Sequence, residues 1–126
     1  MDSTKHAHNR THHGKEKFLE ICLLVLLDGE PTHGYRLLEL LGQFGYQPDE
    51  MDVSTLYRTL RRMEENGLVE SAWEDSDQGP NRRKYRINEA GKNSLEMRIE
   101  HMKRRMVHMQ RVVGYYEKNA DLLDKQ

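Results

Sequence analysis

The residues best suited to chemistry lie between Met51 and Gly67, in the stretch MDVSTLYRTLRRMEENG. Leu56, Leu60 and Met63 recur at helical spacing, which predicts an amphipathic helix with one apolar face. Hydroxyl, phenol and guanidinium groups crowd its other faces, and a helix in the major groove of DNA uses such groups for phosphate oxygens and base edges. The stretch therefore predicts a recognition helix. Its predicted DNA-binding residues are Ser54, Thr55, Tyr57, Arg58, Arg61 and Arg62.

Residues at both ends of this stretch favour the same helix. Asp52 or Ser54 can cap its start, because a short side-chain oxygen accepts a hydrogen bond from a free N–H group of the first turn. Gly67 can adopt the left-handed conformation that ends a helix. The limits of the recognition helix are therefore predicted from local residues.

A second basic cluster follows in a segment that predicts a β-hairpin. Leu68–Glu74 and Arg82–Ile87 have the composition of strands, and Asp75–Asn81 is a polar turn that contains Gly and Pro. Cations on a narrow projection reach phosphates easily, although cations also protect exposed sheet edges from mispairing. The DNA-binding residues predicted in the hairpin are Arg82, Arg83 and Lys84.

Two helices are predicted before the recognition helix. The nearly continuous apolar run from Lys17 to Leu27 predicts a buried helix. The pattern from His33 to Gln43 predicts a second helix capped by Thr32, with Tyr35, Leu38 and Leu41 on one face. Helix, helix and hairpin in this order predict a winged helix-turn-helix.

The first fifteen residues, Met1–Lys15, contain almost nothing apolar and predict a disordered arm. Two other interpretations stay open: its histidines bind a transition metal, or the arm lies along DNA. No acidic or thiol co-ligand stands at metal-site spacing, so no metal and no cofactor are predicted. The histidines of the arm are His6, His8, His12 and His13.

A long final helix is predicted from Glu89 to beyond Tyr116, capped by Asn88, with fraying from Asn119. Apolar residues alternate in steps of four and three along it, which is the seam of a coiled coil and predicts a homodimer. The predicted domains are an arm over 1–15, a DNA-binding domain over 16–88, a dimerisation helix over 89–119 and a tail over 120–126. The predicted dimer-interface residues are Phe18, Cys22, Leu95, Ile99, Met102, Met106, Met109, Val113 and Tyr116.

Composition narrows the class of protein. The 126 residues fit one mainly helical domain with a small hairpin, and a formal net charge of −1 argues against non-specific coating of nucleic acid. The single cysteine, Cys22, allows no intrachain disulfide and fits the cytoplasm. No secretory signal or bilayer-crossing segment is apparent. No enzyme is predicted, because no glycine loop for phosphate, zinc-ligand spacing or nucleophile-acid-base set is recognisable.

Three stretches resemble a known family: HGYRLL from His33, STLYRTLRRMEENGLV from Ser54 and GPNRRKYRINEAG from Gly79. Their order and separations are similar to PadR-family transcriptional regulators of the small type with one long C-terminal helix. The resemblance implies a homodimeric winged-helix repressor on a near-palindromic operator. It implies that Tyr57 contacts the DNA backbone, that Ser54 and Thr55 start the helix in the groove, and that Arg82 and Arg83 form a basic wing. The chain departs from the family at Ser54, Arg58 and Lys84, where Gly, Pro and an aromatic residue are frequent.

The predicted function is sequence-specific binding of double-stranded DNA, with repression by occupancy and release by a small-molecule or other effector. Trp73, Met102 and Met106 are the candidate effector-binding residues, on side-chain type and on adjacency to the dimer seam. For Trp73 the simpler alternative is packing between wing and helix. The alternative for the whole protein is a protein-interaction module that binds DNA only weakly and without sequence preference.

Overall fold

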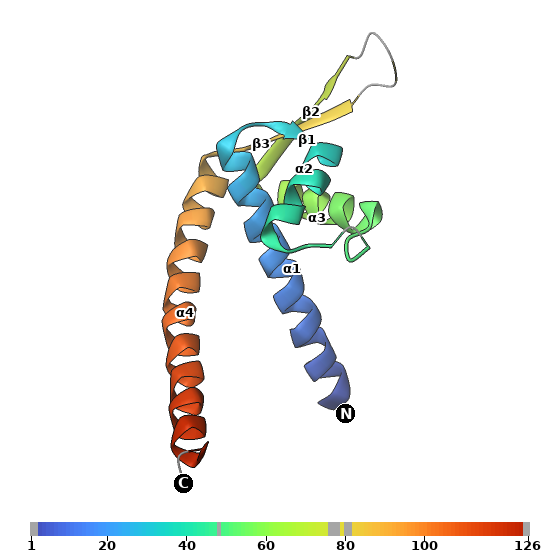
Figure 1. Ribbon diagram of the computed structural model, residues 1–126. Coiled ribbons are helices and arrows are strands. Elements are labelled where there is room, and N and C mark those ends of the chain that lie inside the picture. Colours follow the sequence, from blue (N-terminus) through green and yellow to red (C-terminus); the bar gives the residue numbers. More distant parts are fainter. Residues whose placement is uncertain (1–2, 48, 76–78, 80–81, 125–126) are drawn as a thin grey trace. The chain divides into compact units, whose positions relative to one another are not determined.

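The computed structural model describes residues 3–47, 49–75, 79 and 82–124, and for residues 3–13 and 124 only the helical backbone (Figure 1). By contacts the chain divides into two compact units, Met1–Leu95 and Glu96–Gln126. In chain order the elements are α1 (Ser3–Gly29), β1 (Thr32–His33), α2 (Gly34–Leu40), the 3-10 helix η1 (Leu41–Phe44), α3 (Val53–Glu65), β2 (Val69–Glu74), β3 (Arg82–Ile87) and α4 (Glu89–Asp124).

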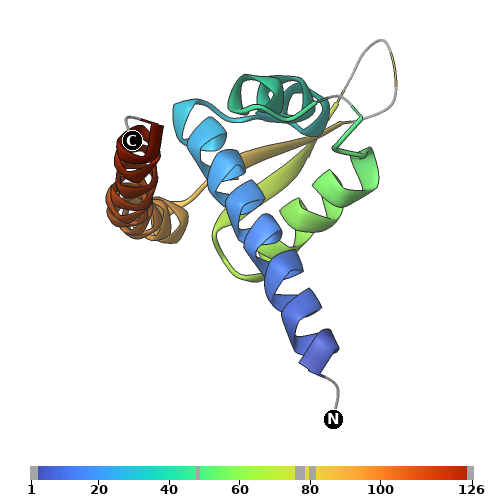
Figure 2. The same cartoon turned by 60° about the horizontal axis from the view of Figure 1, so that its bottom comes forward.

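The core of the first unit forms where α1 meets α2, α3 and β3 (Figure 2). The predicted apolar stripe of α3 is completely buried there. Burial of leucine and methionine side chains contributes about 1.5–3 kcal/mol for each residue, which makes this contact the main support of the helix. The fully buried side chains of the unit are Leu23, Leu24, Leu27, Leu37, Leu41, Leu56, Leu60, Met63 and Val69.

A three-stranded antiparallel sheet in the order β1-β3-β2 completes the winged helix-turn-helix. The hairpin runs from the pair Val69↔Ile87 at its base to Glu74↔Arg82, and it projects beyond the helices (Figure 1). The predicted strand Arg82–Ile87 is confirmed at both ends. Of the predicted turn, most residues lie outside the described part of the chain.

The strand β1 is absent from the prediction, and it changes the role of Thr32. Thr32 pairs with Tyr85 in the sheet, and the residue that caps α2 is His33, without a side-chain hydrogen bond. A strand of two residues is too short to leave an alternating pattern, which explains the error. Along α2 and η1, Leu37 and Leu41 are buried, whereas Tyr35 is 62% exposed. The buried face therefore includes Leu41, as predicted, but Leu37 in place of Tyr35.

Both terminal helices extend further than predicted. α1 begins at Ser3, although disorder was predicted through Lys15, and α4 continues to Asp124, although fraying was predicted from Asn119. Neither segment contains proline, which would remove a backbone N–H donor from the helix. The side chains of the four N-terminal histidines lie outside the described part of the structure.

Two of the predicted dimer-interface residues are buried within the first unit. Cys22 is 4% exposed and Leu95 is 8% exposed within the chain itself. Burial also raises the pKa of the Cys22 thiol to about 11, which leaves it in the unreactive protonated form. These two residues belong to the core of the first unit. In the described part of the chain no helix is both long and apolar enough to cross a membrane.

Candidate nucleic-acid interface

Asp52 caps the start of α3. The sequence analysis named Asp52 and Ser54 as the two candidates for this cap. Its Oδ1 accepts a hydrogen bond from the Thr55 N–H at 2.7 Å. This bond is the largest of the influences that lower the pKa of the Asp52 carboxyl, because a hydrogen bond to the charged form favours that form. The first turn, with Ser54 exposed beside it, therefore has a fixed position.

The end of α3 is a Schellman motif built on Gly67 at φ +75°. The N–H of Leu68 donates to the carbonyl of Met63 at 3.0 Å, and the N–H of Gly67 donates to that of Glu64 at 3.0 Å. Asn88 connects this end to α4, since its Nδ2 donates to the Gly67 carbonyl at 2.9 Å and its Oδ1 accepts from the Gly91 N–H at 2.8 Å. The predicted caps Gly67 and Asn88 are thus parts of one joint.

The exposed side of α3 carries four of the predicted DNA-binding residues. Ser54, Arg58 and Arg61 are exposed and Thr55 is half-buried. Arg58 donates to the Thr55 hydroxyl at 3.3 Å, which draws the guanidinium toward the first turn of the helix. Hydroxyl and guanidinium groups therefore stand together beside the helix N-terminus, where the helix dipole also favours an anion.

Tyr57 occupies a space that depends on Gly34. A Cβ on Gly34 would lie 2.5 Å from the Tyr57 hydroxyl oxygen, so any larger residue there would force the phenol to move from this position. Tyr35 packs edge-on against the Tyr57 ring with centroids 6.4 Å apart. Burial, and secondly Tyr35, raises the pKa of Tyr57, so its hydroxyl stays protonated and able to donate a hydrogen bond to a phosphate.

Arg62 lies apart from this group. It faces α1, where its guanidinium reaches Glu16 at 3.5 Å and Glu20 at 3.6 Å. The prediction placed Arg62 with the DNA-binding residues because it is basic and lies off the apolar stripe of the helix. One residue turns a helix by about 100°, which is enough to bring Arg62 round to the protein interior.

The basic residues of the wing divide between the two faces of the sheet. The pairs Ser71↔Tyr85 and Trp73↔Arg83 alternate with Ala72↔Lys84 and Glu74↔Arg82, and side chains of alternate pairs point to opposite faces. Arg83 therefore shares the face of the buried Tyr85, whereas Arg82 and Lys84 share the other face.

The outer face of the wing is partly occupied by ion pairs. Glu74 lies 3.8 Å from Lys84 and 3.4 Å from His33, and Arg86 pairs with Glu70 at 2.9 Å. These contacts fit the role of cations at a sheet edge. Arg82 is exposed on the same face.

Glu64 and Ser71 are site residues that the sequence analysis missed. The Ser71 hydroxyl donates to the Glu64 carboxylate at 2.8 Å and accepts from Nε of Arg83 at 2.8 Å. The Arg83 guanidinium lies 5.2 Å from the centroid of the Trp73 ring. Trp73 itself is 64% exposed, so its predicted packing between wing and helix was wrong. The alternation of the strand is the only signal that could have placed Ser71 beside Arg83.

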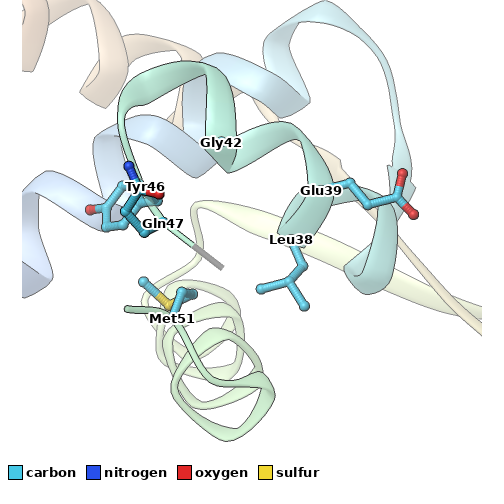
Figure 3. A pocket seen from close by; sticks show the side chains of 6 residues that line it. All are labelled: Leu38, Glu39, Gly42, Tyr46, Gln47 and Met51. Carbon is cyan, nitrogen blue, oxygen red and sulfur yellow. The ribbon is translucent and has the colours of Figure 1, made fainter. Parts of the chain in front are cut away.

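A shallow pocket of about 290 Å³ lies between η1 and the segment that leads into α3 (Figure 3). None of the predicted effector residues Trp73, Met102 and Met106 lines it. Among the described side chains, no three His, Cys, Asp or Glu residues gather as a metal site requires. The residues that line the pocket are Leu38, Glu39, Gly42, Tyr46, Gln47 and Met51.

Solved structures share this fold. A PadR-like transcription factor from Bacteroides fragilis is 25% identical, with a TM-score of 0.68 over 80% of this chain and 98% of its own. A PadR-like transcriptional regulator from Bacillus cereus is 26% identical, with a TM-score of 0.66 over 75% of this chain and 90% of its own. Bacillus subtilis PadR in complex with operator DNA is 20% identical, with a TM-score of 0.57 over 64% of this chain and 46% of its own.

A comparison with curated proteins gave no significant match. The model of the transcriptional regulator PadR-like family matches residues 23–97, which include α2, α3 and the wing. Members of this family are transcriptional regulators and not enzymes. This match covers more than half of the sequence, and the chain therefore belongs to the PadR-like family of transcriptional regulators.

Proposed function

We propose that the protein binds a specific double-stranded DNA operator and represses transcription by occupying it. The observation that carries this proposal is α3, which buries Leu56, Leu60 and Met63 and leaves hydroxyl and guanidinium groups exposed on its other side. The shared fold with Bacillus subtilis PadR, solved with operator DNA, supports it. The proposed contacts are Ser54, Thr55, Tyr57, Arg58 and Arg61 of α3 and Arg82, Arg83 and Lys84 of the wing.

Affinity and selectivity would come from different residues of this set. Arginine and lysine neutralise phosphates, which gives salt-dependent affinity for any sequence. Ser54 and Thr55 at the first turn of α3 can reach base edges, which distinguish one sequence from another. Ser54 is exposed and Thr55 already accepts a bond from Arg58. Selectivity therefore depends on a few contacts at one end of the helix.

We also propose that the protein is a homodimer joined through α4. The seam residues Met106, Met109, Val113 and Tyr116 are between 52% and 73% exposed. A continuous apolar stripe of this size marks a surface that is covered by a partner, and its alternating spacing suits an identical helix. Ile99 and Met102 continue the seam toward the N-terminus of α4, and Phe18, 44% exposed, remains a proposed contact on α1. A two-fold dimer matches a near-palindromic operator.

Release of DNA by a small-molecule effector completes the proposed mechanism. Trp73, Met102 and Met106 remain the proposed effector residues, on the strength of their large and adaptable apolar side chains. The exposure of Trp73 supports its availability. The free Cys22 and a DNA partner agree with a cytoplasmic protein.

Selection of genomic DNA tests this proposal. The purified protein is mixed at physiological salt with fragments of the genome that encodes it, and the retained fragments are sequenced. We expect enrichment of an inverted repeat, above all upstream of the protein's own gene or a neighbouring one. Retained fragments that share no sequence and are lost with a modest rise in salt would contradict specific repression. They would favour a protein-interaction module that uses the exposed face of α4.

A further inference from the structure

A chain of hydrogen bonds connects the end of α3 to the middle of the wing. The Glu64 carboxylate accepts from the Ser71 backbone N–H at 3.1 Å and from the Ser71 hydroxyl at 2.8 Å. The Ser71 hydroxyl in turn accepts from Nε of Arg83 at 2.8 Å. A hydroxyl can donate once while it also accepts, so Ser71 bonds both neighbours at the same time. The side chain of Arg83 is thereby fixed to the recognition helix.

The aromatic ring of Trp73 fixes the same guanidinium from a second side. Its centroid lies 5.2 Å from Cζ of Arg83, within the range of a cation–π interaction. These contacts use Nε and one face of the guanidinium. The described residues give no hydrogen bond from the two terminal nitrogens of Arg83, and paired N–H groups of this kind bind a phosphate in a bidentate manner.

The other basic residues of β3 are held differently. Lys84 and Arg86 lie on the opposite face, near Glu74 and Glu70 respectively. The two carboxylates offset part of their charge. Arg83 has no direct carboxylate partner among the described residues: it is bonded to the Ser71 hydroxyl and lies over a ring, and the Glu64 carboxylate is bonded to the other side of that hydroxyl.

We propose that Ser71 and Glu64 are positioning residues for DNA binding, and that they hold Arg83 as a phosphate clamp at a fixed place relative to α3. This inference rests on the proposed DNA binding and deepens it. A preorganised side chain loses less conformational entropy on binding than a free one. The wing and the recognition helix would then contact the DNA backbone as one rigid surface.

The first test needs no DNA, because Trp73 is the only tryptophan in the sequence. We expect Arg83→Ala to raise the acrylamide quenching constant of tryptophan fluorescence, since the guanidinium no longer shields the ring. Ser71→Ala should raise it in the same direction, and Ser71→Thr, which keeps the hydroxyl, should leave it near the wild-type value. Wild-type quenching in Ser71→Ala would overturn the positioning role. Far-UV circular dichroism confirms that each variant is folded.

The second test measures affinity for a short duplex of mixed sequence at low salt, which a phosphate contact binds without regard to sequence. We expect Arg83→Ala to weaken binding about tenfold, as for one lost charge-assisted hydrogen bond. Ser71→Ala should weaken it about threefold, through the extra side-chain entropy. In the Arg83→Ala background Ser71→Ala should have no further effect. An undiminished effect there would mean that Ser71 acts through the fold in general.

Arg86→Ala is the matched control, because it removes one positive charge from the same strand without touching Ser71 or Trp73. A loss equal to that of Arg83→Ala would overturn the clamp, since charge alone would then explain it. Failure of this inference and failure of the proposed function are distinguishable. The quenching and duplex experiments test the clamp, whereas enrichment of an operator from genomic DNA tests specific regulation.

Discussion

Gly34 shows how one missing methyl group can position a functional side chain. It is helical and buried, and its φ is not positive, so its backbone does not require glycine. The requirement comes from Tyr57, whose ring edge fills the place of a Cβ. Tyr35 closes the other side of the same ring. The proposed phosphate contact of Tyr57 therefore depends on a residue that itself carries no functional group.

We expect Gly34→Ala to destabilise the protein by about 1–3 kcal/mol, the usual cost of an added methyl group in a packed site. Urea denaturation gives the value. Gly42→Ala is the control, since nothing lies within 4 Å of its added Cβ, and we expect a change within about 0.5 kcal/mol. If Gly34→Ala costs the same in a Tyr57→Ala background, the assignment of the clash to Tyr57 is wrong.

Asp52 gives the stability a dependence on pH. Its pKa is lowered in the folded state by the Thr55 bond, so its stabilising effect is complete above the ordinary value of 3.8 and is lost as the pH falls through the lower folded value. We expect Asp52→Asn to be less stable than the wild type at neutral pH, with the difference shrinking below pH 3.8. Denaturation curves of both proteins at several pH values measure this difference in stability. A difference that is constant with pH would contradict the charged cap.

At the scale of elements, α3 separates two arginines four residues apart into different roles. Arg58 is exposed beside Thr55, whereas Arg62 pairs with Glu16 and Glu20 of α1. Residues four apart are neighbours on one helix face, so the division comes from the carboxylates of α1 that lie beside Arg62.

We expect Arg58→Ala to weaken DNA binding and to reduce the slope of log affinity against log salt by about one, as for a single lost phosphate contact. Arg62→Ala should leave that slope unchanged and lower the free energy of unfolding by about 1 kcal/mol, for a half-exposed ion pair. DNA titrations at several salt concentrations give the salt slope, and urea denaturation gives the free energy of unfolding. Equal salt slopes for Arg58→Ala and the wild type would remove Arg58 from the interface.

The elements that the sequence predicted well are those specified by residues close together in the chain. The caps at Asp52, Gly67 and Asn88 use hydrogen bonds within a few residues, and the α3 stripe repeats within one helix, so each leaves a readable pattern; the bond from Asn88 to Gly67, 21 residues away, leaves none. β1 left none, because it is made by pairing with distant residues such as Tyr85. The same limit applies to the site. The charges were readable, but the side of the sheet or helix on which Arg62, Arg83 and Lys84 lie depends on register.

At the scale of the molecule, the second unit exposes many large apolar side chains, which no other part of the unit covers. Besides its seam residues, Val112, Tyr115 and Leu123 are at least 70% exposed. A protein that left this surface open would associate non-specifically. The apolar surface therefore argues for an assembled form, whereas Cys22 and Leu95, which the sequence assigned to the interface, are already covered within one chain.

We expect the wild type to be a dimer and the variant Met106→Asp with Val113→Asp to be a monomer, because two carboxylates would be buried in the seam without partners. Light scattering after size-exclusion chromatography measures the mass. Arg104→Asp, on the opposite side of the helix from the seam, should remain dimeric. A monomeric wild type, or a dimeric seam variant, would contradict the proposed interface.

The joint at Asn88 has a mechanical consequence. Its side chain bonds the last carbonyl of the α3 cap and the first turn of α4 at once, and its backbone N–H donates to the Leu68 carbonyl at 3.3 Å. A Cβ on Gly91 would collide with that same carbonyl oxygen, so the two segments are in direct contact. Any torque applied to the beginning of α4 must either break these bonds or turn the recognition helix with it. Within the first unit, the joint thus couples the orientation of the first turn of α4 to that of the C-terminal end of α3.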